Sequence, residues 1–100
     1  MKPRDMTAVI DRKRYSTETA ILIAGNDYWD GHNFERSGRN TFLYRTPKGA
    51  YFAAHITCWQ GEADRLEPLD VDGAVELYEG LSEHRVEFEA AFPGVEVEEA

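Results

Sequence analysis

The clearest hydrophobic pattern lies in the middle of the chain, where two segments rich in β-forming residues flank a short turn. These segments are Thr41–Thr46 and Tyr51–Trp59, and the residues between them include Pro47 and Gly49. Proline suits the second position of a type I turn, and Gly49 can take the left-handed conformation of the bulge that follows. The pattern therefore predicts a β-hairpin over residues 41–59.

The two faces of this hairpin differ in polarity, because side chains alternate between the faces of a strand. On the first strand, Phe42 and Tyr44 share one face, and Thr41, Leu43 and Arg45 share the other. The second strand has an apolar set (Phe52, Ala54, Ile56 and Cys58) and a mixed set (Tyr51, Ala53, His55, Thr57 and Trp59). We expect one face to pack on helices and the other to be partly solvated.

The N-terminal residues predict a strand, a turn and a short helix. Thr7–Ile10 is a β-prone run, and the polar residues 11–13 follow it as a turn. Ser16 or Thr17 can cap a helix over Thr17–Ala24, which Gly25 would end. A helix of about two turns is marginal alone, so its apolar side chains must pack on a core.

The chain after the hairpin predicts an edge strand and a longer helix. Leu66–Leu69 contains Pro68, and an edge strand tolerates proline because its outer N–H groups need no partner. Asp70 can cap a helix that runs to about Leu81 and has one apolar side.

The segment Ser82–Phe92 fits two interpretations. Val86, Phe88 and Ala90 alternate as in a strand, but the segment also has apolar pairs at helical spacing. We favour a second helix, capped by Ser82 and ended by the Pro-Gly pair at 93–94.

These elements define an α+β fold: a small antiparallel sheet, centred on the 41–59 hairpin, with helices packed on one face. A chain of 100 residues with 42% hydrophobic residues is of one-domain size and can bury a modest core. We expect residues 1–94 to form this domain and residues 95–100 to form an acidic C-terminal tail.

Charge is divided unevenly between the two halves of the chain. Residues 1–50 carry nine Lys or Arg and six Asp or Glu, a net charge of +3, whereas residues 51–100 carry two and thirteen, a net charge of −11. An acidic chain is a poor candidate for binding nucleic acid directly. No apolar run is long enough to cross a membrane, and the single cysteine, Cys58, fits a reducing compartment. We therefore expect a cytoplasmic protein with neither membrane nor nucleic acid as a direct partner.

Much of the negative charge falls at helical spacing. If the chain were helical throughout this region, five carboxylates would lie within about 80° of one another at about 100° per residue. They are Asp72, Glu76, Glu79, Glu83 and Glu87. Val86 and Ala90 would then fall on the same stripe, so we expect a break near Ser82 that leaves the carboxylates on two short helices. Such a row can imitate the phosphates of nucleic acid and occupy a basic groove. A solvated face that keeps the protein soluble is the simpler alternative.

A second candidate surface lies in the predicted loop 26–40. It combines aromatic and basic residues (Tyr28, Trp29 and His32 with Arg36 and Arg39), a combination that suits protein–protein contacts or base stacking. The alternative is that the aromatic side chains of this loop cover the edge of the core.

Catalytic and metal sites find little support in the sequence. The histidines and Cys58 have no diagnostic metal-ligand spacing, and the acids of the 26–40 loop do not follow the calcium-loop order. No glycine-rich phosphate motif or nucleophile–base arrangement is present. We expect no catalytic residues, no metal and no cofactor, and so a protein that is not an enzyme; a small metal-dependent enzyme is the remaining alternative.

Three segments resemble a family of short uncharacterised proteins carried by bacterial phages and mobile elements. They are DRKRYSTETA (Asp11–Ala20), FLYRTPKGAYF (Phe42–Phe52) and LEPLD (Leu66–Asp70), which share the family patterns RYxTETA and LYRTxKGxYF. Arg12 departs from the family, which usually has glycine at this position. The resemblance implies a β–α–β–β–α order and a mobile-element setting, and it transfers no catalytic residue.

Together, these features predict a non-catalytic acidic binding protein of phage or mobile-element origin. It would inhibit a host nucleic-acid-handling complex by occupying a basic surface, as an anti-CRISPR or other anti-defence protein. Its partner would be a host protein or ribonucleoprotein complex with a basic groove. The alternative is a structural or regulatory interaction module that acts as a homodimer through a sheet edge or the 26–40 loop.

Overall fold

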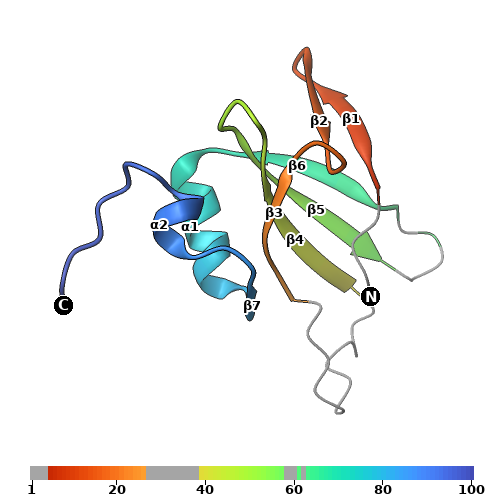
Figure 1. The fold of residues 1–100 in the computed structure, drawn as a ribbon. Coiled ribbons are helices and arrows are strands. Elements are labelled where there is room, and N and C mark those ends of the chain that lie inside the picture. The colour runs from red at the N-terminus through yellow and green to blue at the C-terminus, as the bar shows by residue number, and fades with distance from the viewer. Residues whose placement is uncertain (1–4, 27–38, 58–60, 62) are drawn as a thin grey trace.

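The computed structural model describes residues 5–26, 39–57, 61 and 63–100, and it is α+β, with most of its regular structure in antiparallel strands (Figure 1). In chain order the elements are β1 (Thr7–Ile10), β2 (Lys13–Ser16), β3 (Ile21–Gly25), β4 (Arg39–Arg45), β5 (Tyr51–Thr57), β6 (Arg65–Leu69), α1 (Val71–Gly80), β7 (Glu83–His84) and α2 (Phe88–Ala91). β1 and β2 form a two-stranded sheet. The other strands form a five-stranded sheet in the order β6-β5-β4-β3-β7.

The predicted central hairpin is confirmed by β4 and β5 as far as Thr57, and Cys58 and Trp59 lie outside the described residues. Phe42 lies opposite Ala54 and Tyr44 opposite Phe52, so the predicted apolar sets share a face. Gly49 has φ +91°, and the amide N–H of Thr46 donates to the carbonyl of Ala50 at 2.7 Å. Turn chemistry and strand alternation therefore agree with the sequence here.

The first hairpin is also confirmed, and its turn is tight. Ile10 pairs with Lys13, so only Asp11 and Arg12 form the loop. Both have positive φ (51° and 66°), as a two-residue type I′ turn requires. Aspartate tolerates this conformation, whereas arginine adopts it at a cost in free energy.

The predicted helix over Thr17–Ala24 is wrong, because its apolar residues form the strand β3. Ile21 and Ile23 are β-branched and favour an extended backbone, and the strand gains β4 as a neighbour. Thr17 does not cap a helix. Its Oγ1 instead accepts a hydrogen bond from the amide N–H of Met6 at 2.8 Å, across the first hairpin. The β–α–β–β–α order implied by the resemblance therefore fails at its first helix.

The edge strand and the longer helix are confirmed. β6 places Pro68 at the edge of the five-stranded sheet. Asp70 caps α1, since its Oδ1 accepts a hydrogen bond from the N–H of Gly73 at 2.7 Å. The helix ends at Gly80, and Leu81 follows with an extended backbone.

The favoured helix over Ser82–Phe92 is wrong in its first half. Glu83 and His84 form β7, which pairs with Gly25 and Ala24 of β3, and only Phe88–Ala91 is helical. Ser82 is not a helix cap. The carbonyl of Ile23 accepts hydrogen bonds from the N–H groups of Arg85 and Val86. These bonds to β3 favour an extended backbone over a helix in this segment.

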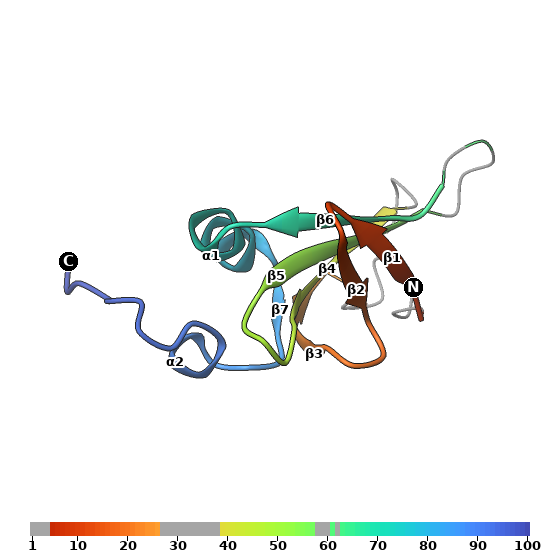
Figure 2. The ribbon, with the colours of Figure 1, turned by 90° about the horizontal axis from the view of Figure 1, so that it is seen from above.

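The core is divided between the two faces of the central sheet. One cluster joins Leu43 and Tyr51 to Ala74 and Tyr78 of α1 and to Phe92, which follows α2. The other joins Phe42, Tyr44, Phe52, Ala54, Ile56 and Leu66 to Tyr15 of β2. The apolar face of the central hairpin therefore packs on the β1–β2 hairpin rather than on helices. Figure 2 shows α1 and α2 at one end of the molecule and β1 and β2 toward the other.

Candidate functional site

Helix α1 presents three of the predicted partner-binding carboxylates to solvent. Ala74 and Tyr78 are buried against the sheet, and Asp72, Glu76 and Glu79 are exposed on the remaining surface of the helix. None of the three forms an ion pair with another residue in the part of the chain that the structure describes. Their charge is therefore not neutralised by a described neighbour.

The other two predicted carboxylates lie on different elements. Glu83 is half-buried in β7, and Glu87 is the exposed residue before α2. A continuous helical stripe of five carboxylates is thus wrong, because β7 interrupts the helix. The acidic face that the structure supports consists of Asp72, Glu76 and Glu79, and we use the name "acidic face" for these three residues.

Most residues of the predicted aromatic–basic cluster are not among those that the structure describes. Tyr28, Trp29, His32 and Arg36 lie outside the described residues. Arg39 is placed at the start of β4, where its backbone lies opposite Thr57. The contribution of this cluster to binding stays a prediction.

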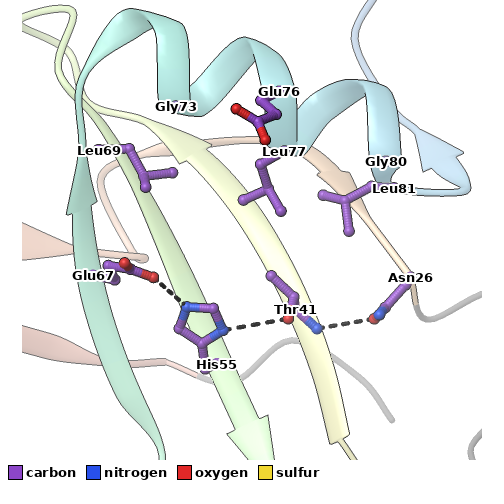
Figure 3. Close-up of a pocket in the computed structure, with 10 residues that line it drawn as sticks. All are labelled: Asn26, Thr41, His55, Glu67, Leu69, Gly73, Glu76, Leu77, Gly80 and Leu81. Carbon is purple, nitrogen blue, oxygen red and sulfur yellow. Dashed lines mark hydrogen bonds and ion pairs between the residues drawn. The ribbon is translucent and has the colours of Figure 1, made fainter.

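A groove of about 490 Å³ lies between α1 and the sheet, beside the acidic face (Figure 3). Leu69, Leu77 and Leu81 point into it, and Glu76 of α1 and Glu67 of β6 stand at its borders (Figure 3). Its lining is completed by Asn26, Thr41, His55, Gly73 and Gly80.

A chain of hydrogen bonds crosses the sheet along one border of this groove. His55 Nε2 lies 2.8 Å from Glu67 Oε1, and His55 Nδ1 lies 3.3 Å from Thr41 Oγ1. The amide N–H of Thr41 donates to Asn26 Oδ1 at 2.9 Å. Three neighbouring strands and the end of β3 are thereby tied together by polar groups, and the orientations of His55 and Glu67 are fixed.

The sequence patterns do not predict this polar chain. Thr41 and His55 fall on the less apolar faces of the predicted hairpin, but no local pattern links either residue to Glu67. The link depends on the pairing of β5 with β6, in which Arg65 lies opposite His55 and Glu67 opposite Ala53. The sequence feature that points to this link is the edge strand predicted after the hairpin. If that strand pairs antiparallel with the hairpin, Glu67 lies diagonally next to His55.

One titratable group near the acidic segment is clearly perturbed. Burial raises the pKa of the Tyr78 hydroxyl above its ordinary value, and the negative charges of Glu89 and Glu87 raise this pKa further. The hydroxyl donates to the carbonyl of Val86 at 2.8 Å. Tyr78 thus links α1 to the segment after β7 in its neutral form.

Two further properties concern metals and membranes. Within residues 5–26, 39–57, 61 and 63–100, no group of three or more His, Cys, Asp or Glu side chains is arranged to hold a metal ion. No helix among these same residues is long and apolar enough to cross a membrane.

Comparisons of the chain with protein-family models, with curated protein sequences and with solved structures found no match.

Proposed function

We propose that this protein is a non-catalytic binding protein whose acidic face engages a basic surface on a protein partner. The observation that carries the proposal is the exposure of Asp72, Glu76 and Glu79 on one helix, without an ion-pair partner among the described residues. Exposed like charges at helical spacing repel each other by about 0.2–0.5 kcal/mol per pair. A cationic partner would remove that repulsion and would be steered toward the face during association.

The negative charge of the surrounding chain supports the same proposal. Residues 70–100 carry ten Asp or Glu and one Arg, a net charge of −9. A partner that normally binds phosphates has a complementary surface, because phosphate-binding grooves are lined with Lys and Arg. We therefore propose a host nucleic-acid-handling protein or ribonucleoprotein complex as the partner, and inhibition of a CRISPR or other defence complex as the outcome.

The setting of this activity follows from the resemblance rather than from the fold. We propose a phage or mobile-element origin and action in the host cytoplasm. We also propose that residues 1–94 act as one domain, with α1 and α2 as the helical layer expected over one face of the sheet. In this arrangement the helical layer supplies the binding surface.

We propose that the polar chain along the groove is structural and not catalytic. The order hydroxyl, imidazole, carboxylate in Thr41, His55 and Glu67 is that of a hydrolase triad. Such a triad also needs N–H donors for the oxyanion, and the N–H of Thr41 is already donated to Asn26. The chain therefore fits a role in holding the border of the groove.

A competition assay tests the proposed function. Nuclease and surveillance complexes from host defence systems would be loaded with fluorescent nucleic acid, and the protein would be added at rising concentration. We expect the protein to displace nucleic acid from at least one complex, and we expect added salt to weaken its effect. Failure to displace nucleic acid from any complex, or displacement that is indifferent to salt, would contradict the proposal.

One observation favours the homodimer alternative. β7 pairs with β3 only at Ala24 and Gly25, so the outer edge of Ile21 and Leu22 has no strand partner among the described residues. Ile21 is also 55% exposed. A second copy could pair along this edge. Sedimentation velocity at several concentrations tests this, because a dimer that an Ile21→Lys variant abolishes supports the alternative and a strictly monomeric chain removes it.

A further inference from the structure

We propose that the groove beside α1 receives an arginine side chain from the partner's basic surface. This inference rests on the proposed function and assigns it a specific contact. The acidic face alone would attract any cation, whereas the groove adds shape and apolar surface. Its volume of about 490 Å³ lies in the range of pockets that hold small ligands.

The lining of the groove matches both parts of an arginine side chain. Leu69, Leu77 and Leu81 offer apolar surface to the aliphatic stem, which packs on such surfaces while its charged head stays near water (Figure 3). Glu67 and Glu76 at the borders offer carboxylates to the head group. A guanidinium is weakly hydrated and binds carboxylates with two parallel hydrogen bonds, so it suits this partly apolar site better than an ammonium.

The polar chain prepares Glu67 for this contact. If His55 donates from Nε2 to Glu67 Oε1, its Nδ1 accepts from the hydroxyl of Thr41, and every member of the chain is satisfied. Arg65 also approaches Oε1, at 3.8 Å. Both contacts use Oε1, which leaves Oε2 to accept from an incoming guanidinium. The Glu67 side chain is 47% exposed and therefore accessible to a ligand.

The other acid of the groove has a matched control on the second helix. Glu76 lines the groove, whereas Glu89, which is exposed on α2 and lies outside the acidic face, does not. Neutralising either one changes the net charge of the protein by the same amount. Any difference between the two variants therefore reports the groove and not the overall field.

The test is an NMR titration of the ¹⁵N-labelled protein with N-acetyl-arginine-N-methylamide. The neutral citrulline analogue has nearly the same shape and serves as the ligand control. We expect saturable shifts of the amide signals of Gly73, Gly80 and Thr41 with the arginine probe and none with the citrulline probe. Glu76→Gln and Glu67→Gln should each weaken binding about tenfold, since each removes a charged hydrogen-bond partner, and Glu89→Gln should leave it within about twofold.

Each contrary result has a defined meaning. Equal binding of citrulline, equal weakening by Glu89→Gln, or shifts spread along α1 without saturation would overturn the groove as an arginine site. If one of these results is found while displacement of nucleic acid by the protein remains salt-dependent, the groove inference fails and the proposed function stands. If the groove binds arginine but the protein displaces nucleic acid from no complex, the proposed function fails instead.

Discussion

At the scale of single residues, two asparagines join the end of β3 to the start of β4. Asn40 is buried, and its Nδ2 donates to the side-chain and backbone oxygens of Asn26 at 2.9 and 3.0 Å. Asn26 Oδ1 also accepts from the N–H of Thr41. One amide oxygen thus satisfies two donors beside the groove, and its loss would leave both without this acceptor.

We predict that Asn26→Ala lowers the free energy of unfolding by about 1–3 kcal/mol, the cost of leaving such groups unpaired. Asn26→Asp keeps an oxygen in the same place and should lose clearly less. Urea unfolding followed by circular dichroism would measure both variants. A loss of less than about 0.5 kcal/mol in Asn26→Ala would mean that water replaces the amide at little cost.

Tyr78 makes stability depend on pH at the alkaline end. Its pKa is raised in the folded protein by burial and by Glu89 and Glu87, so the folded state holds this proton more tightly than the unfolded state. The contribution is fully present below the unfolded value of about 10 and is lost as the pH rises from there through the raised pKa. We predict a fall in the unfolding temperature above pH 10 that is smaller in Tyr78→Phe. Identical alkaline profiles for the two proteins would refute this link.

At the scale of elements, the first turn offers a test of backbone conformation. Arg12 has φ +66° in a two-residue loop, a conformation that disfavours a side chain with a Cβ atom. We predict that Arg12→Gly stabilises the protein by about 0.5–1 kcal/mol. Glycine relieves the strain of the left-handed backbone in the folded state, and we expect this gain to exceed the cost of the extra conformational entropy that glycine gives the unfolded chain. Thermal unfolding measures the change, and Lys13→Gly, a substitution in β2, should destabilise. Equal effects of the two substitutions would argue against a strained turn.

Local signals predicted some elements and failed for others. Turn chemistry at Gly49 and the cap at Asp70 act within a few residues, so the central hairpin and α1 could be predicted from the sequence. β3 and β7 depend on partners far along the chain: Ile21 pairs with Arg45, and His84 with Ala24. The Thr-Glu-Thr-Ala start and Gly25 resemble helix boundaries, but pairing with β4 outweighs these weak local preferences.

The candidate site follows the same division. Asp72, Glu76 and Glu79 lie within one helix, so their common exposure could be predicted from helical spacing. The positions of Glu83 and Glu87 could not be predicted in this way, because β7 interrupts the helix and its pairing with β3 is long-range. The link between His55 and Glu67 required the order β6-β5-β4, which arises from long-range pairing.

At the scale of the whole molecule, the two charged regions lie on opposite sides of the central sheet. The basic turn around Arg12 and Lys13 belongs to the hairpin that packs with one core cluster, and α1 and α2 pack with the other (Figures 1 and 2). The acidic helices and the basic first turn thus lie on different sides of the central sheet. A basic partner approaching this molecule would be guided to the helical side.

Binding through the acidic face is tested most directly by two charge-reversed variants that carry the same net charge. Glu76→Lys with Glu79→Lys reverses the acidic face, and Asp5→Lys with Glu18→Lys reverses two exposed acids near the other sheet. The measurement is the Kd for a complex from which the protein displaces nucleic acid, at several salt concentrations. We predict that the first pair weakens binding at least about tenfold and flattens its salt dependence, and that the second pair has a much smaller effect. Equal effects of the two pairs, or binding unchanged by the first, would contradict binding through the acidic face.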